Sequence, residues 1–296
     1  MIWQKNLIKL YFYLCEDRSI QGYLQNLRMS NNGNLHFTDE EILTIYLFGI
    51  VQNMSKVKHI YQYTAQHLKD WFPQLPSYQA FNARLNRLEA CFNILINGLI
   101  KQDLVAKDIH EKVLDSLPII VAGNSRSSSA KVAKALCSKG YCSSKGIYYY
   151  GLKLHALNIV QAEHIPKPYQ VWITAAAEND LTAARPILEH IGNSKLYADK
   201  IYTDAALNEE LQTHQNSIIL TPIKNKKGQK IKDAATAIYS TLVSRVRQPI
   251  ESFFNWINEK TNIQNAQRVR SEQGLLVHIW GKFAAAILLL TQFFNS

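Results

Sequence analysis

Apolar residues recur at helical spacing through the first 110 residues of the chain. Thr38 and Glu41 form a T-x-x-E capping box directly before the apolar stretch EILTIYLFGIV, which predicts the start of a helix. A second helix is predicted over about 56–69, and Ser77 is placed to cap a third. The third helix carries an apolar stripe made of Phe81, Leu85, Leu88, Phe92 and Leu95. The N-terminal region is therefore predicted to be all helical.

The third helix also has a polar face, made of Asn82, Arg84, Asn86 and Arg87. A face of this kind suits a DNA groove, so Arg84 and Arg87 are candidate DNA-binding residues. A solvated face of a bundle helix competes with this interpretation. The preceding turn DWFPQLP is longer than the turn of a standard helix-turn-helix, which favours the solvated face.

Strand patterns replace the helical spacing from residue 111 onward. The β-branched and aromatic runs LDSLPIIVA, IYYYGLKLHALNIV and YQVWITAAA predict three successive strands. There follow a helix opened by Asp180, the strand KLYAD, a helix after Asp204, the strand SIILTPI, and helices at about 245–260 and 275–294. This order is that of the RNase H-like fold. The predicted class is α/β, with an all-α N-terminal domain for DNA binding or assembly at 1–110 and a mixed-sheet catalytic domain at 111–296.

Composition narrows the class of protein. Of 296 residues 47% are hydrophobic, which excludes a disordered chain, and the net charge of +10 favours an anionic partner such as nucleic acid. Four scattered cysteines make no disulfide framework, so we expect a reducing compartment, the cytoplasm. The longest apolar run, FAAAILLLTQFF, falls short of a membrane span of about 20 residues and predicts a buried helix and no membrane partner.

The candidate chemistry lies among the acids, because the sequence motifs of P-loop NTPases, Rossmann dehydrogenases, zincins and α/β-hydrolases are absent. Asp115 lies in the first strand, Asp199 ends the strand KLYAD, and Glu251 lies on the penultimate helix. The corresponding elements meet in an RNase H-like sheet, so the three carboxylates are expected to converge. Carboxylate oxygens suit Mg²⁺ or Mn²⁺.

Longer segments carry a family resemblance. DSLPI, SKGYCSSKGIYYYGLKLH, LTAARPIL, YADKIYTD, SRVRQPIESFFNWINEKTNIQNAQRVRS and GLLVHIWGKFAAAILL are similar to the 982 family of bacterial insertion-sequence transposases. DEEILTIYLFGI and WFPQLPSYQAFNARLNRL extend the likeness over nearly the whole chain. The resemblance implies a DDE transposase that uses two divalent ions, Mg²⁺ or Mn²⁺. Such an enzyme cuts at terminal inverted repeats and joins the freed 3′-OH to target DNA, and we expect it to act as a homo-oligomer on DNA.

Carried over by motif, the catalytic and metal-binding triad is Asp115 in DSLPI, Asp199 in ADKIYTD and Glu251 in PIESFFNW. Asp115 would bridge both ions, and Asp199 and Glu251 would each hold one. Asp180 competes for the second place, but its position before a helix suits an N-cap, and Asp204 is interpreted in the same way.

Glu251 has a second interpretation, an ion pair with Arg247 four residues earlier on the same helix face. In the light of the resemblance, Arg247 is similar to the arginine of an R-x-x-x-E signature, placed to hold a DNA phosphate or to orient Glu251. The chain departs from that signature, since Ser244 and Asn258 stand where its tyrosine and lysine fall. Lys260 is the candidate substitute for the lysine.

Further DNA contacts are expected from a basic segment before this helix, with phosphate-binding candidates Lys224, Lys226, Lys227, Lys230 and Lys232. A solvated loop is the alternative. Arg268, Arg270, Lys131 and Lys134 are weaker candidates. Trp256 suits either core packing or stacking on an unpaired base. The stripe of Ile250, Phe253, Phe254 and Ile257 is expected to be core, and His155 and His278 are expected to be structural.

Three functions follow from these patterns. The leading one is an active transposase. The others are a catalytically inert DNA-binding protein of the same descent and an RNase H-like nuclease without strand transfer.

Overall fold

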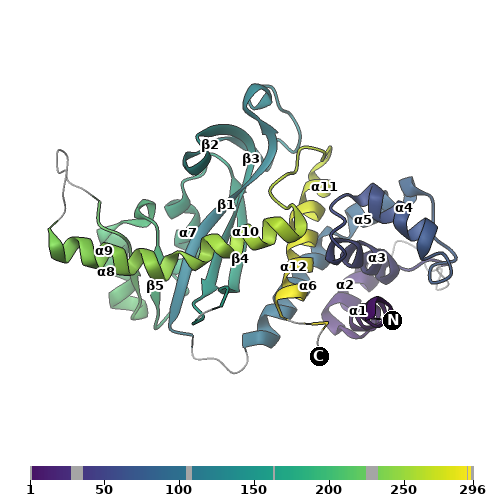
Figure 1. The fold of residues 1–296 in the computed structure, drawn as a ribbon, viewed down its shortest axis with the longest axis horizontal. Coiled ribbons are helices and arrows are strands. Elements are labelled where there is room, and N and C mark those ends of the chain that lie inside the picture. The colour runs from purple at the N-terminus through teal and green to yellow at the C-terminus, as the bar shows by residue number, and fades with distance from the viewer. Residues whose placement is uncertain are drawn as a thin grey trace. The chain divides into compact units, whose positions relative to one another are not determined.

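The structure is a computed structural model that describes residues 2–27, 36–104, 109–162, 164–224, 233–291 and 293–294 (Figure 1). The chain forms two compact units. The sheet unit is Ala106–Trp256, and the helical unit joins Met1–Val105 to Ile257–Ser296. The sequence predicts one domain from 111 to 296. In the structure the apolar C-terminal helix packs against helices of the N-terminal region.

The sheet unit contains every described strand of the chain. Its strands are β1 (Glu111–Gly123), β2 (Ser138–Cys142), β3 (Ile147–Ile159), β4 (Lys167–Ala175), β5 (Lys195–Ala198) and β6 (Ile218–Leu220). Its helices are α7 (Asp180–Leu188), α8 (Ala205–Gln215), α9 (Ala234–Arg247) and the first part of α10 (Pro249–Thr261). The three predicted leading strands correspond to β1, β3 and β4, whereas the short β2 and the helix α9 were not predicted.

The six strands make one mixed sheet. Five of them follow the order β2-β3-β1-β5-β6, and the sixth, β4, pairs with β3. β1 and β3 are antiparallel, while β1, β5 and β6 run parallel to one another. β2 and β4 pair with successive halves of β3, at Ile147–Gly151 and Leu152–Ile159. This helical region followed by a mixed sheet with helices confirms the predicted RNase H-like fold.

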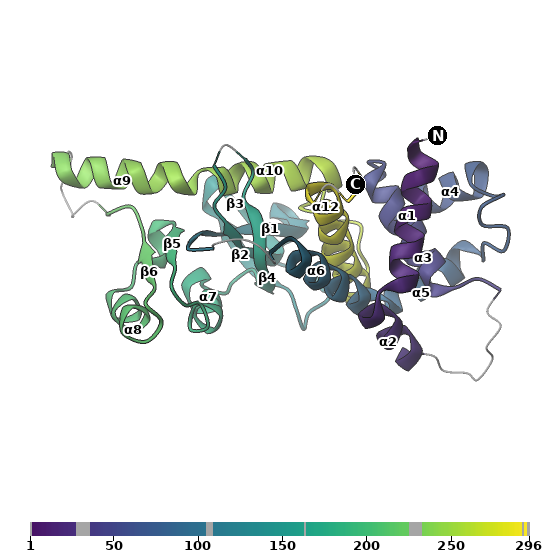
Figure 2. The same ribbon diagram turned by 90° about the horizontal axis from the view of Figure 1, so that it is seen from below.

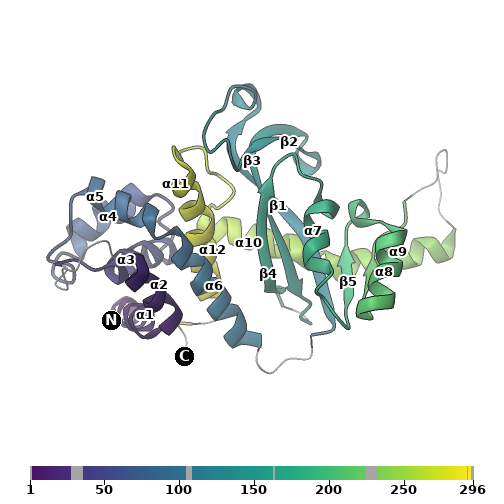
Figure 3. The same ribbon diagram turned by 180° about the vertical axis from the view of Figure 1, so that it is seen from behind.

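Helices cover both faces of the sheet. α9 and α10 lie on one face, and α7 and α8 lie on the other (Figures 2 and 3). The α7 and α8 side is closed by an apolar cluster of Leu114, Leu157, Ala184, Leu188, Ile191, Leu196, Ala198, Tyr202, Leu207, Leu211 and Ile219. Because successive strand residues point to opposite faces, the residue after Leu114 points toward α9 and α10.

The helical unit is built from both ends of the chain. Its helices are α1 (Ile2–Glu16), α2 (Arg18–Leu27), α3 (Asp39–Val51), α4 (Val57–His67), α5 (Tyr78–Arg87), α6 (Glu89–Leu104), α11 (Glu272–Leu276) and α12 (Lys282–Leu290). A π-helical segment, Val277–Gly281, joins α11 to α12. α3 is central, since every residue from Ile42 to Ile50 is buried, and α12 packs on α3 and α6.

Local signals account for the helix starts. The predicted capping box is confirmed: Thr38 Oγ1 accepts from the Glu41 amide at 3.2 Å, and the Glu41 carboxylate accepts from the Thr38 amide at 2.5 Å. Ser77 caps α5 as predicted, by accepting from the Ala80 amide. The predicted single third helix is two helices that meet at Leu88, with its apolar stripe fully buried.

The C-terminal helix is longer than its apolar run suggests. Glu272–Leu290 forms 19 continuous helical residues, long and apolar enough to cross a membrane by length and composition alone. However, 67% of its most apolar window is buried inside the protein, as in a core helix. Its packing also explains Gly281, where an added Cβ would collide with the ring of Tyr46.

Candidate active site

Asp115 and Asp199 lie beside each other on neighbouring parallel strands. The β1–β5 register pairs Leu114 with Ala198. The residue that follows each of them is an aspartate, Asp115 and Asp199. Adjacent strands are about 4.8 Å apart. Asp199 is the first residue after β5 and leads into a 3₁₀ turn at Lys200–Tyr202. The fold thus brings together two of the three acids expected to converge.

Arg247 connects Asp115 to the third acid. It is the last residue of α9; its Nη1 donates to Asp115 Oδ2 at 2.8 Å and its Nη2 to Glu251 Oε1 at 2.7 Å. The Asp115 side chain is 23% exposed and that of Glu251 54% exposed. The ion pair between Arg247 and Glu251 that the sequence left open therefore exists, and the same guanidinium also bonds the half-buried Asp115.

The pKa of Asp115 is raised by burial and by neighbouring acids. Burial raises its pKa to about 6, and repulsion by Asp199 and Asp180 acts in the same direction. Hydrogen bonding from the Ser116 amide and the charge of Arg247 oppose the rise. Carboxylates that repel one another at close range form a favourable setting for a cation.

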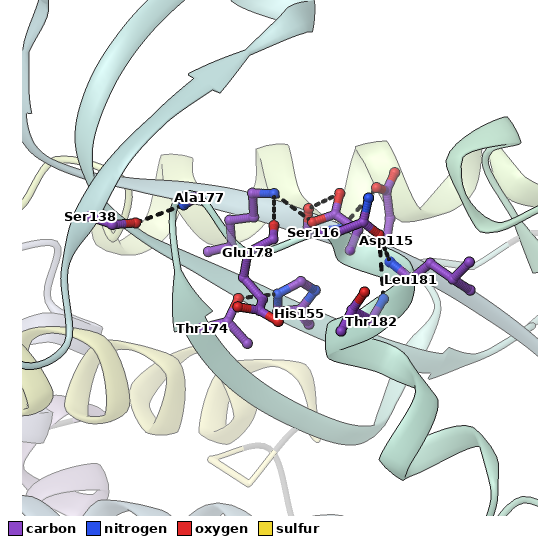
Figure 4. A network of polar contacts seen from close by, with 12 residues as sticks. Asp115, Ser116, Ser138, His155, Thr174, Ala177, Glu178, Leu181 and Thr182 are labelled. Carbon is purple, nitrogen blue, oxygen red and sulfur yellow. Dashed lines mark hydrogen bonds and ion pairs between the residues drawn. The ribbon is translucent and has the colours of Figure 1, made fainter.

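Asp180 does not cap α7, contrary to the interpretation from sequence. Asn179 is the N-cap, since its Oδ1 accepts from the Leu181 and Thr182 amides. Asp180 instead accepts from Lys153 Nζ at 2.8 Å and from Ser116 Oγ at 3.3 Å. Figure 4 labels Ser116 and Asp115 in this network of polar contacts.

Strand alternation separates Asp180 from the triad. Ser116 is the neighbour of Asp115 on β1, so it faces the α7 side of the sheet and Asp115 faces the α9 side. The Ser116 contact thus assigns Asp180 to the α7 side, where Lys153 neutralises it. Asp204 behaves as expected and caps α8 through the Leu207 amide.

Sequence reasoning missed three neighbours of these acids, namely Ser116, Lys153 and Tyr202. Burial raises the pKa of Tyr202 well above its usual value, and the charges of Asp180, Asp115 and Asp199 add to the effect. Its buried hydroxyl has no hydrogen-bond partner among the described residues. The one signal was proximity in sequence, because Tyr202 follows Asp199 by three positions and Ser116 adjoins Asp115.

His155 lies in the same sheet and has the contacts of a core residue. Its ring stacks on Trp172 at a centroid distance of 5.2 Å, and Nε2 lies 2.8 Å from Thr174 Oγ1. Burial lowers its pKa to about 4, so the imidazole is neutral at physiological pH. His155 therefore supports the sheet, as expected from the sequence.

The donor set suits a divalent ion, although one ligand is engaged elsewhere. Within the described ranges, no three His, Cys, Asp or Glu side chains are grouped as a metal site. The Glu251 carboxylate accepts a hydrogen bond from Arg247. The carboxylates of Asp115 and Asp199 offer hard oxygen ligands, so their chemistry fits Mg²⁺ or Mn²⁺.

The remaining candidates are more scattered. Lys226, Lys227 and Lys230, with Lys232, lie outside the described residues, and Lys224 is exposed after β6. Trp256 is half-buried on α10, beside the apolar stripe, which is buried as expected.

Three cations of the helical unit were also candidates. Arg84 bonds the Asp39 carboxylate at 2.6 Å and the Phe37 carbonyl at 2.9 Å, contacts that favour a structural role. Arg87 is exposed, and Lys260 lies 3.6 Å from Glu259. DNA binding by these residues stays a prediction.

An RNase H-like sheet with aspartates on adjacent parallel strands and a glutamate on the following helix defines a class of phosphoryl-transfer enzymes. The family described as Transposase DDE domain matches residues 106–272, more than half of the chain. The chain belongs to this family, which makes it a transposase in the general sense and a DNA-binding protein. DDE transposases generally use divalent metal ions. No curated protein and no solved structure matches the chain.

Proposed function

We propose that this protein cuts DNA at the terminal inverted repeats of an insertion sequence and joins the freed 3′-OH to target DNA. The observation that carries the proposal is the geometry of the acids: Asp115 and Asp199 directly follow the paired strand residues Leu114 and Ala198, and Arg247 bonds both Asp115 and Glu251. We further propose that it belongs to the 982 family, on the sequence segments given above.

In this proposal Asp115, Asp199 and Glu251 hold two Mg²⁺ or Mn²⁺ ions. Bound there, the metal lowers the pKa of the attacking hydroxyl and neutralises charge on the phosphate. The chain itself prepares the ligands. The Ser116 amide and Arg247 hold the Asp115 carboxylate, and Lys153 neutralises Asp180, which limits the repulsion inside the site.

Arg247 has two tasks in the proposed cycle. In the structure its guanidinium neutralises Asp115 and Glu251 together. If the carboxylates held metal ions, the same planar group would be available to a DNA phosphate, which it suits by shape and charge. Lys224, Lys226, Lys227, Lys230 and Lys260 are proposed to hold the DNA backbone, and Trp256 a displaced base.

Assembly and location follow from the reaction. Two element ends must be cut and joined together, so we propose a homo-oligomer on DNA. We propose the cytoplasm as its compartment; the structure describes all four cysteines, and none of them forms a disulfide.

The test uses labelled duplexes from the DNA that flanks the gene, incubated with purified protein and Mg²⁺ or Mn²⁺. Glu251→Ala is compared with the matched control Glu259→Ala, another exposed acid of α10 whose carboxylate pairs with Lys260. We expect nicking at a repeat boundary and 3′-OH joining in the wild type and the control, with both lost in Glu251→Ala. Cutting without joining would indicate a nuclease, and specific binding without cutting would indicate an inert DNA-binding protein.

A further inference from the structure

The helical unit contains a large polar groove that the catalytic proposal does not use. Its volume is about 660 Å³, within the range of ligand pockets. The start of α4, the polar face of α5, residues 262–271 and the α11–α12 stretch form its walls. All of these belong to the same compact unit.

The charges around this groove have one sign. Five cations line it, namely Lys56, Lys58, Arg268, Arg270 and Lys282, whereas none of its lining residues is Asp or Glu. Among the described residues, none of the five is paired with a carboxylate. Five cations around one groove repel one another, so the site favours an anion.

Lys282 is the most informative of the five. It is only 2% exposed, and its Nζ donates to a single acceptor, the Asn262 carbonyl, at 3.0 Å. Burial lowers its pKa to about 7. An ammonium group has three protons to donate, so a ligand in the groove can satisfy those that Asn262 does not.

A second buried lysine has several partners for its ammonium group within the protein. Lys112, in the sheet unit, is 3% exposed and donates to the Ile109 carbonyl and to Ser194 Oγ. Its Nζ also lies over the ring of Tyr169, 5.0 Å from the centroid. Lys112 therefore has its partners within the protein, whereas Lys282 has one acceptor and an adjoining groove.

The groove also contains uncharged side chains that can form hydrogen bonds with a base. Asn82 and Asn86, one turn apart on α5, line it, and the structure gives their amides no hydrogen-bond partner among the described residues. An asparagine amide both donates and accepts, as the recognition of a base edge requires. α4 adds an N-terminus whose N-cap, Lys56, makes no side-chain cap, so the first-turn amides face an anion site.

We infer that this groove binds DNA, with backbone phosphates against Lys282, Arg268 and Arg270 and a base edge against Asn82 and Asn86. The inference rests on the proposed function for its choice of DNA over a free nucleotide, which shares the same phosphate and base. It gives the protein a DNA site separate from the metal-binding acids.

The test measures DNA binding by the full-length protein with EDTA present, so that no cutting occurs. Fluorescence anisotropy follows a labelled duplex from the DNA flanking the gene, over a series of salt concentrations. The groove variant is Arg268→Gln with Arg270→Gln. The matched control is Lys5→Gln with Lys101→Gln, two exposed lysines of the same unit that do not line the groove.

We expect the groove variant to bind at least tenfold more weakly, and its plot of log affinity against log salt to flatten by about 2, since each lost phosphate contact contributes about 0.9. The control should keep the wild-type slope. Lys282→Met should also weaken binding while its thermal unfolding midpoint stays at or above the wild-type value, which shows that the loss is not unfolding. Equal effects in groove and control variants would overturn the inference.

Three further outcomes separate the alternatives. If deoxynucleoside monophosphate binds the wild type but not the groove variant, while DNA binds both equally, the ligand is a free nucleotide and the DNA site is refuted. If the wild type neither cuts nor joins in Mg²⁺ but the groove variant still loses DNA affinity, the proposed catalysis fails and the groove stands. If cutting and joining occur and the groove variant binds normally, only the groove inference fails.

Discussion

The acid cluster of the sheet unit and the cationic groove of the helical unit differ in whether the protein itself supplies side chains of the opposite charge. Around the acids, the chain provides its own counter-ions, because Arg247 bonds Asp115 and Glu251, and Lys153 bonds Asp180. Around the groove, no carboxylate of the described residues faces the five cations.

The difference teaches how to separate two kinds of charged site. An internally balanced cluster has its opposite charges supplied by the protein itself. An unbalanced cluster carries a stored repulsion that only an external partner relieves. Substitutions on each side of this comparison should therefore affect different measurements.

The largest effect is expected from the two aspartates that compete for the second place in the triad. Asp199→Asn should lower the single-turnover nicking rate by about 10³-fold or more, because it removes a metal ligand beside Asp115. Asp180→Asn should lower the rate by less than about tenfold, since Asp180 lies on the α7 side of the sheet and is paired with Lys153. Equal losses in the two variants would mean that Asp180 belongs to the metal site.

The next effect concerns the packing that supports the groove. Gly281→Ala should destabilise the protein by about 1–3 kcal/mol, because the new methyl group collides with the ring of Tyr46, a groove residue. Thermal or urea unfolding measures the loss. Gly22→Ala is the control, since a Cβ at that position meets nothing within 4 Å. A loss of the same size in the control would remove the packing explanation.

A smaller effect should appear in sequence discrimination. Asn82→Ala with Asn86→Ala should reduce the preference for flanking DNA over unrelated DNA by about tenfold, because base edges lose their partners. Affinity for unrelated DNA should change little, since the cations remain. Competition binding with both duplexes checks this, and an equal loss for both DNAs would reassign the amides to backbone contacts.

The acid side should show a modest gain in stability. Asp115→Asn should stabilise the metal-free protein by about 1 kcal/mol at pH 8, because the folded-state pKa of Asp115 is raised to about 6 and ionising it there is costly. The gain should vanish as the pH falls through about 6 toward 4, where the wild-type carboxyl is protonated as well. Urea unfolding at several pH values measures it, and a gain that does not vary with pH would contradict the assignment.

The groove side should show the opposite pH dependence, at a similar size. Burial lowers the pKa of Lys282 to about 7, so the wild type is destabilised most below pH 7 and recovers as the pH rises from 7 toward 10. Lys282→Met should therefore gain about 1 kcal/mol or more at pH 6, and less at pH 9. The same unfolding series tests both variants, and parallel pH profiles for the two would end the comparison.

Much of this architecture could be predicted from local sequence patterns. The capping box at Thr38, the β-branched runs of β1, β3 and β4, and the candidate acids Asp115 in β1 and Asp199 after β5 were each found from neighbouring residues alone. β2 was missed because its sequence, SKGYC, has little apolar or β-branched character. The predicted helix at 245–260 ran through the break at Gln248, although Pro249 is a residue that favours the first turn of a new helix.

The missed parts of the site depend on contacts across the fold. Lys153 and Asp180 meet only once β3 and α7 lie on the sheet, and Tyr202 reaches the acids only through its buried turn. The helical period identified 275–294 as a buried helix but not the surface that buries it. Its partners are α3 and α6, more than 170 residues earlier in the chain.

The split of the helical unit has a consequence for the order of synthesis. The sheet unit is one continuous segment, Ala106–Trp256, so it can close as soon as that segment has left the ribosome. The N-terminal helices must wait, because α12 covers α3 and α6 and Lys282 completes the groove. A nascent chain thus carries Asp115, Asp199 and Glu251 in a folded sheet unit before α12 is made and completes the proposed surface for DNA.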